Sequence, residues 1–219
     1  MWCIGNLTEE YRERMYNLLE LYARPFRSTE PVICLDEKSK QLTGETRPAL
    51  PMKPGTPAKH DYEYARAGTC NLFVAVEPKG GRRTVVVTDQ RTKTDFVAFV
   101  QHLIEDVYAK ARRIHFVMDN LNTHFRKCFD EVLGKKRAQA LLRHVVFHYT
   151  PKHASWLNMA EIEIGILDRQ CLDRRLPTRT ILVAEVDAWQ QQRNTDKRGI
   201  LWLFTRQDAD QKMARHYVS

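Results

Sequence analysis

Three acidic residues that are far apart in the sequence stand where a fold could bring their carboxylates together. Asp36 follows the apolar residues 31–35, and Asp119 follows the apolar residues 114–118. Both runs are typical of buried strands, and the carboxyl end of a buried strand borders the crevice where open α/β sheets bind ligands. The alternative for Asp119 and the Asn120 that follows it is an ordinary turn or helix cap.

Glu161 is the third acid, and the sequence predicts that it lies about one turn into a helix that begins near Asn158. At ~100° per residue, Glu161 falls at the edge of an apolar stripe, whereas Glu163 lies about 200° away from it. We therefore expect only one of the two glutamates to face the sheet, and the apolar neighbours favour Glu161. A lone glutamate on a helix is more often exposed, so this assignment depends on the two aspartates.

Three carboxylates brought together repel one another, and their pKa values rise unless a cation is present. Hard divalent cations such as Mg²⁺ and Mn²⁺ prefer oxygen ligands of this kind. Two such ions ~3.5–4 Å apart can activate water and stabilise the leaving oxygen in phosphoryl transfer. The acids therefore indicate metal-dependent phosphoryl transfer if the fold brings them together.

The charge of the chain favours a polyanionic substrate. Lys and Arg number 35 against 27 Asp and Glu, which gives a net charge of +8. A folded surface with this excess attracts nucleic acid, although a merely solvated basic surface is an equal alternative. The basic residues recur in small clusters along the whole chain, at residues 79–83, 110–113, 135–137, 174–175 and 197–198.

A proline-rich segment at residues 47–61 is predicted to be an irregular loop. Loops of this length inside a domain are more often functional than idle. Lys53 lies in this loop and could hold a phosphate backbone beside the carboxylates, while a plain surface crossover is the alternative.

The remaining pattern predicts one α/β domain with a mixed sheet flanked by helices. No window approaches the ~18 consecutive apolar residues of a membrane span. The five cysteines are scattered without a C-x-x-C pair, which favours a reducing cytosol. The expected strands are residues 31–35, 70–77, 83–88, 114–118 and 145–149, and the expected helices are residues 8–24, 125–133, 158–172 and 179–193 and one beginning near residue 94.

Taken in order, the three motifs resemble the catalytic domain of DDE-type transposases, in the bacterial insertion-sequence branch related to mariner. The first motif is residues 34–37, the second is Asp-Asn with a histidine shortly after, and the third acid follows a Tyr-Thr-Pro loop and a Leu-Asn pair at residues 149–161. The resemblance runs from about residue 32 to residue 202. It implies a ribonuclease H-like fold with a mixed five-stranded sheet flanked by helices.

The resemblance also implies an activity and a set of site residues. The implied activity is divalent-metal-dependent DNA strand cleavage followed by strand transfer at transposon ends. Asp36, Asp119 and Glu161 would be the catalytic metal ligands for Mg²⁺ or Mn²⁺, with two ions expected. His124 is as well explained by a structural role. The residues expected near nucleic acid are Asn120, His124, Lys152, His153, Asn158 and Lys53.

The chain departs from the mariner pattern in two ways. The gap between Asp119 and Glu161 holds 41 residues and is longer, with the extra length near residues 135–142. No helix-turn-helix is recognisable before Asp36, so we expect a separately encoded DNA-reading segment. The resemblance to mariner-like relatives also implies a homodimer. We expect the protein to be cytoplasmic and nucleoid-associated. The expected divisions are a helical lead-in at 1–30, the catalytic domain at 31–205 and a tail at 206–219. The alternative functions are a stand-alone nuclease of the same fold and an inactive DNA-binding remnant.

Overall fold

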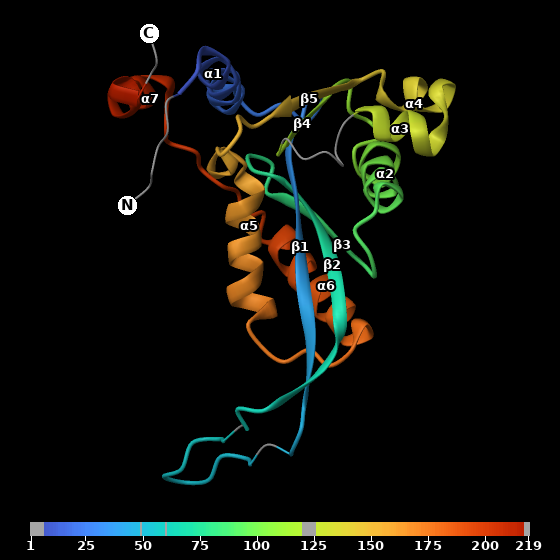
Figure 1. The fold of residues 1–219 in the computed structure, drawn as a ribbon, viewed down its shortest axis with the longest axis vertical. Helices are drawn as coiled ribbons and strands as arrows, with labels where there is room; N and C mark the ends of the chain where they lie inside the picture. Colours follow the sequence, from blue (N-terminus) through green and yellow to red (C-terminus); the bar gives the residue numbers. More distant parts are fainter. Residues whose placement is uncertain (1–6, 49, 60, 120–125, 217–219) are drawn as a thin grey trace.

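The computed structural model describes residues 7–48, 50–59, 61–119 and 126–216, which are arranged around a five-stranded sheet (Figure 1). Two π-helical turns, Leu103–Val107 and Asp168–Leu172, extend α2 and α5. The strands are β1 (Val32–Glu45), β2 (Tyr64–Glu77), β3 (Arg82–Thr88), β4 (Ile114–Met118) and β5 (Val145–Tyr149). The helices are α1 (Glu9–Ala23), α2 (Lys93–His102), α3 (Arg126–Leu133), α4 (Lys135–Leu142), α5 (Met159–Leu167), α6 (Arg179–Thr195) and α7 (Arg206–Met213).

The sheet is mixed, and its spatial order is β3-β2-β1-β4-β5. β1, β2 and β3 are antiparallel, whereas β4 and β5 run parallel to β1. The turn between β2 and β3 places Gly81 at φ +66°, and a Cβ there would lie 2.5 Å from the carbonyl oxygen of Lys197. A side chain is therefore excluded at this position. The mixed five-stranded sheet flanked by helices that the sequence predicts is confirmed.

β1 and β2 are much longer than the sequence indicates. β1 continues for nine residues beyond Asp36 to Glu45, and its polar half pairs with the first half of β2, with a register shift between Gln41 and Thr43. The prediction that Asp36 follows the end of its strand is therefore wrong. The polar half escaped detection because apolar runs mark buried strands, and here the antiparallel pairing itself supplies the order.

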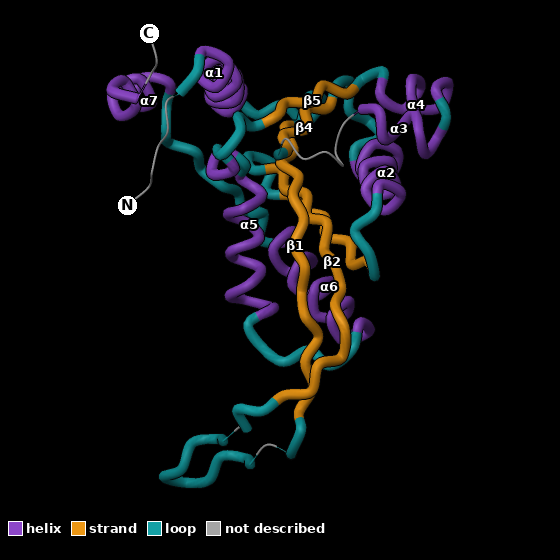
Figure 2. Tube along the Cα trace, viewed as in Figure 1, coloured by secondary structure: helices purple, strands orange, loops and turns teal. Residues whose placement is uncertain are grey.

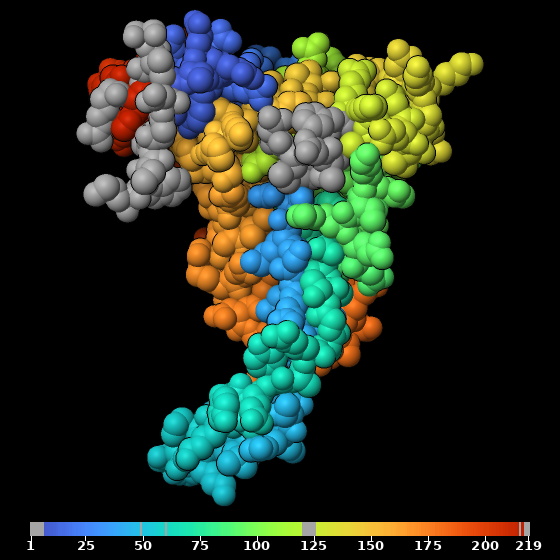
Figure 3. All heavy atoms as spheres, viewed as in Figure 1, coloured from blue at the N-terminus to red at the C-terminus, as the bar shows by residue number. Residues whose placement is uncertain are grey.

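The described residues 46–48, 50–59 and 61–63 form an arm that projects from the far end of the β1–β2 ribbon (Figure 2). Two isolated bridges, Leu50 with Lys59 and Lys53 with Thr56, give it a loose hairpin form. The space-filling view shows the arm standing clear of the body of the protein (Figure 3). The predicted loop is confirmed as largely irregular, but it projects away from the body of the protein and does not cross its surface.

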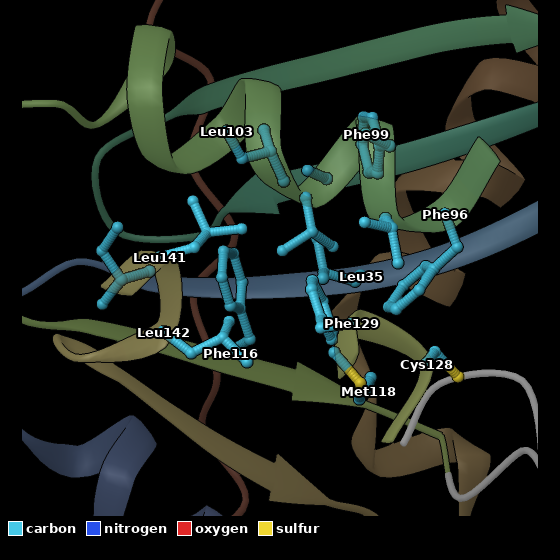
Figure 4. Close-up of a cluster of buried hydrophobic side chains, with 14 of the residues drawn as sticks. Leu35, Phe96, Phe99, Leu103, Phe116, Met118, Cys128, Phe129, Leu141 and Leu142 are labelled. Atoms are coloured by element: carbon cyan, nitrogen blue, oxygen red, sulfur yellow. The ribbon is translucent and has the colours of Figure 1, made fainter. Parts of the chain in front are cut away.

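Each face of the sheet has its own core. On one face, Phe116 and Leu35 pack against Phe96, Phe99 and Phe129 from α2 and α3 (Figure 4). The helix α4 lies on this same side, so the extra length near residues 135–142 is a packed helix. Its buried side chains are Ala138, Leu141 and Leu142.

The opposite face is covered by α1, α5 and α6. Cys34 and Val117 lie here in contact with a cluster that includes residues of α1 and the start of α5. Further along β2 and β3, Leu72 and Val85 belong to a third cluster that α6 completes. Every residue of β1 that shares the orientation of Cys34 therefore faces this helical layer.

Most predicted helices are confirmed, and several begin at a side-chain cap. Thr8, Thr178 and Thr205 each accept a backbone hydrogen bond in the first turn of α1, α6 and α7. Thr92 forms a reciprocal capping box with Asp95 at the start of α2. These polar residues just before amphipathic runs are the signal that locates helix starts in sequence.

The lead-in and the tail pack onto the same body as the sheet. Met15 and Leu18 of α1 are buried in the cluster that contains Cys34, and α7 contributes the buried Ala209 to that cluster. Tyr16 of α1 hydrogen-bonds to Asp210 of α7. Among the described residues, no helix has the length and apolar character that crossing a membrane requires.

Candidate catalytic carboxylate site

Asp36 and Asp119 are placed together by the parallel pairing of β1 and β4. Cys34 pairs with Val117 in the last register position between these strands, and each aspartate lies two residues further on. Because side chains alternate between faces, both aspartates lie on the face of Cys34 and Val117, toward α5. The sequence prediction that the two strands deliver neighbouring acids is consistent with this register, although β1 continues past Asp36.

Asp119 is oriented by the neighbouring strand. The hydroxyl of Thr150, just after β5, donates a hydrogen bond of 3.1 Å to Asp119 Oδ1. The backbone N–H of Thr150 donates to the carbonyl of Met118 at 3.0 Å, so the pairing of β4 and β5 extends by one residue. Burial raises the pKa of Asp119, the Thr150 hydrogen bond opposes this rise, and the charge of Glu161 adds to it.

Asp36 is the more strongly perturbed of the two acids. Burial raises its pKa to about 7, and the negative charges of Asp119, Glu37 and Glu161 add to the rise. The backbone N–H of Glu37 donates to Asp36 Oδ1 at 2.8 Å, which favours the charged form. A carboxyl whose pKa lies near neutrality beside other acids is typical of functional sites.

Glu161 lies in the first turn of α5 and its side chain is exposed. Its negative charge contributes to the raised pKa of both Asp36 and Asp119. The prediction that Glu161 is the glutamate packed against the protein interior is wrong, because Glu163 occupies that position with 0% exposure. Glu163 is buried in ion pairs with Arg83 and Arg193. Both arginines are far from Glu163 in the sequence, so the helical pattern of residues 158–172 could not reveal these partners.

Asn158 joins α5 to β1. Its Oδ1 accepts the backbone N–H of Ala160 at 3.1 Å as the helix cap, and its Nδ2 donates to the carbonyl of Leu35 at 2.8 Å. The residue has 0% exposure. We therefore correct its expected role from contacting nucleic acid to fixing the start of α5 beside Asp36.

The other predicted nucleic-acid residues lie in different places. Lys152 and His153 are exposed in the turn that precedes α5, with His153 in the left-handed region at φ 63°. Lys53 is exposed in the arm, which starts after Glu45, about 30 Å along β1 from Asp36 at ~3.3 Å per residue. Lys53 is therefore not beside the carboxylates. Asn120 and His124 lie outside the described residues.

Sequence reasoning missed two contributors near the site. Thr150 belongs to the quoted Tyr-Thr-Pro motif, and the register after β5 would have placed it beside Asp119. Glu37 adds negative charge near both aspartates, and its side chain is 2% exposed with Arg91 Nη1 3.2 Å from its Oε1. The sequence feature that could have identified Glu37 is its position directly after Asp36 in the first motif.

The donor set suits a hard divalent cation. All three side chains offer carboxylate oxygens, and the charge of Asp119 disfavours the charged form of the half-buried Asp36 until a cation is bound. Within the part of the chain that the structure describes, no three His, Cys, Asp or Glu side chains already stand close enough to hold a metal ion. Glu161 is exposed on the first turn of α5, so the three acids do not form a closed metal site in this structure.

The strand order, with one acid on the central strand and another after its parallel neighbour, defines a ribonuclease H-like fold. The chain belongs to the family described as DDE superfamily endonuclease, which matches residues 31–182, more than half of its length. No curated protein matches the chain.

Three crystal structures of Mos1 mariner transposition complexes share this fold. The Mos1 paired end complex with Mn is 17% identical with a TM-score of 0.55, over 90% of this chain and 60% of that chain. The paired end complex with Mg is 16% identical with a TM-score of 0.55, over 100% of this chain and 66% of that chain. The Mos1 Strand Transfer Complex is 16% identical with a TM-score of 0.53, over 87% of this chain and 57% of that chain. This chain therefore spans less than two thirds of the length of these relatives.

Proposed function

We propose that this chain is the catalytic domain of a DNA transposase that cleaves DNA strands at transposon ends and transfers them to a target. The observation that carries the proposal is the placement of Asp36 beside Asp119 on parallel strands, with Glu161 acting electrostatically on both. Membership of the DDE superfamily endonuclease family and the fold shared with Mos1 complexes support it.

Asp36, Asp119 and Glu161 would hold Mg²⁺ or Mn²⁺, and we propose two ions. Metal ions held there would activate a nucleophile and stabilise the leaving oxygen of the phosphodiester. Hydrogen bonds within the chain orient the two aspartates. The hydroxyl of Thr150 donates to Asp119, and the backbone N–H of Glu37 donates to Asp36. Asn158 fixes the start of the helix that carries the third proposed donor, Glu161.

The substrate in this proposal is double-stranded DNA. The net charge of +8 supports it, because cationic groups that neutralise phosphates supply a salt-dependent attraction to a nucleic-acid backbone. Lys152 and His153, exposed next to α5, are well placed for the strand being cut, and we propose Lys53 as a contact to more distant phosphates. We further propose a homodimer, a separately encoded helix-turn-helix partner, and action at the nucleoid.

The test is cleavage of a labelled DNA duplex with and without Mg²⁺ or Mn²⁺. We expect Asp119→Asn to abolish metal-dependent nicking while DNA binding in EDTA is retained or strengthened, because a negative charge is removed. Asp196→Asn, an exposed aspartate after α6, is the matched control and should cut normally. Undiminished cutting by the Asp119 variant would refute the assignment of the site.

A second assay separates transposase from nuclease. Transfer of a labelled 3′-hydroxyl end into target DNA supports the transposase, whereas hydrolysis without joining supports a stand-alone nuclease of the same fold. DNA binding without cleavage in Mg²⁺ or Mn²⁺ at low salt identifies an inactive remnant.

A further inference from the structure

Glu163 lies at the centre of a buried ionic cluster behind α5. Arg83 Nε and Nη2 donate to its two carboxylate oxygens at 2.9 and 3.3 Å, and Arg193 Nε and Nη2 donate to the same oxygens at 2.8 and 3.3 Å. The side chains of Glu163 and Arg83 have 0% exposure, and that of Arg193 has 13%. Two arginines therefore hold one carboxylate by paired, charge-assisted hydrogen bonds.

Both arginines are themselves fixed to other elements. Arg83 belongs to β3, and its Nη1 also donates to the carbonyl oxygens of Gly81 at 2.9 Å and Arg193 at 3.1 Å. The side chain of Asn194 on α6 makes two hydrogen bonds to the backbone of Arg83, at 2.8 and 2.9 Å. The carboxylate of Glu163 is thus tied to a strand and a helix that are already joined to each other.

Two further contacts join the two ends of α5 to β1. Asn158 Nδ2 donates to the carbonyl of Leu35, and Lys38 Nζ lies 2.5 Å from Oδ2 of Asp168 at the end of the helix. These contacts set the position of α5 along the strand. The rotation of α5 about its own axis is set by Glu163, because the ion pairs with Arg83 and Arg193 hold this side chain inward.

The direction of Glu163 determines the direction of Glu161. The two residues are about 200° apart around the helix, so holding Glu163 inward turns Glu161 to the exposed side of α5. With side chains reaching ~6 Å from the helix axis, a rotation of about 20° displaces the Glu161 carboxylate by about 2 Å. Metal ligation tolerates only about 0.2 Å of error in ligand distance, so such a rotation disrupts a shared metal site.

We propose that Glu163 is a positioning residue that, through Arg83 and Arg193, sets the rotation of α5 and thereby presents Glu161 to the metal that Asp36 and Asp119 hold. The inference rests on the proposed function, because it assumes that these three acids bind a divalent cation. A buried charge cluster often stabilises no more than apolar side chains of the same volume. Its paired hydrogen bonds add a directional constraint to the apolar packing of Met159, Ala160 and Leu167 on the same helix.

The experiment measures Mn²⁺ binding to the full chain by the loss of the free Mn²⁺ paramagnetic resonance signal, beside thermal unfolding of each variant. Glu163→Gln should remain cooperatively folded well below its unfolding temperature and bind Mn²⁺ at least tenfold more weakly. Glu161→Gln is the reference for a lost ligand. The matched control is Glu185→Gln on α6, which removes the surface ion pair between Glu185 and Arg174. This variant should bind Mn²⁺ as tightly as the unaltered protein does.

A milder variant covers the case in which Glu163→Gln does not fold. Arg193→Met removes one of the two arginines and leaves a neutral Arg83–Glu163 pair, so it should fold and weaken Mn²⁺ binding several-fold. Its DNA affinity in EDTA should change no more than that of a surface arginine variant such as Arg174→Met. An unchanged Mn²⁺ affinity in a folded Glu163 or Arg193 variant would overturn the inference.

Failure of the proposed function gives a different result. If the unaltered chain binds no Mn²⁺, with or without DNA, or if Glu161→Gln binds as tightly as the unaltered chain, the metal site itself is wrong. If Glu161→Gln loses affinity while folded Glu163→Gln keeps it, the site stands and the positioning role of Glu163 is rejected.

Discussion

The hydroxyl of Thr150 donates a hydrogen bond of 3.1 Å to the carboxylate of Asp119. This contact joins the ends of β4 and β5 and lowers the pKa of a carboxyl group that burial and the charge of Glu161 raise. It therefore favours the charged form of Asp119 and orients the carboxylate at the place where a cation would bind.

Replacing Thr150 with Val should raise the pKa of Asp119 further, because the hydrogen bond to its charged form is lost. A hydrogen bond to a charged group contributes about 1.5–3 kcal/mol, so its loss disfavours the charged carboxylate that has to bind the metal. We expect the pH profile of metal-dependent cleavage to shift to higher pH, with about tenfold slower cutting at neutral pH. Thr195→Val, on the exposed side of α6, should leave the profile in place.

The stability of the metal-free protein should depend on pH through Asp36. The pKa of this carboxyl is about 7 in the folded protein against an ordinary value of 3.8, so the folded state holds a proton that the unfolded chain releases. Stability from this group is fully present below pH 4 and is lost as pH rises through 7.

Asp36→Asn should therefore gain stability over the unaltered protein between pH 5 and pH 8, by on the order of 2 kcal/mol. Thermal unfolding in EDTA across this range measures the difference. Parallel pH curves for the two proteins would mean that Asp36 is not perturbed by its neighbours.

Added Mn²⁺ should stabilise the folded protein more at pH 8 than at pH 5, because Asp36 has to lose its proton to bind the ion. At tenfold excess over the dissociation constant, binding contributes about 1.4 kcal/mol, which corresponds to about 3–6 °C in Tm for a chain of this size. Thermal unfolding with Mn²⁺ measures the shift, and Asp36→Asn should remove it. An equal shift in that variant would place the bound ion elsewhere.

Lys53 offers a test of the arm as a DNA contact. If it neutralises one phosphate, Lys53→Ala should weaken binding to all sequences alike and reduce the slope of log affinity against log salt by about 1. Lys53→Arg should retain the slope. Because Lys53 is exposed at the far end of the arm, neither change should alter the unfolding temperature. A slope unchanged in Lys53→Ala would remove this residue from the DNA-binding surface.

The sequence predicted the elements whose signals are local. β3, β4 and β5 are apolar runs, and α1, α5 and α6 begin at threonine or asparagine caps, so these elements were found close to their observed bounds, whereas α4 and α7 were not predicted. The polar half of β1 was missed because its order comes from pairing with β2, which no local pattern reveals.

The candidate site was predicted as a set of residues, whereas its geometry was not. Glu161 and Glu163 differ only in which one finds a buried partner, and that partner is supplied by Arg83 of β3 and Arg193 of α6. Asn158 resembles a site residue in the motif, yet its burial and its contact with Leu35 depend on how α5 docks on β1. Tertiary contacts of this kind decide which polar residues of a motif touch a ligand.

The most direct test of the central claim is a crystal structure of the chain soaked in Mn²⁺, with the ion located by its anomalous scattering. The account predicts Mn²⁺ bound by oxygens of Asp36, Asp119 and Glu161 at about 2.1 Å, the distance typical of small hard cations, with Glu161 rotated inward from its exposed position. Mn²⁺ bound elsewhere, or bound by the aspartates while Glu161 still points into solvent, would contradict it.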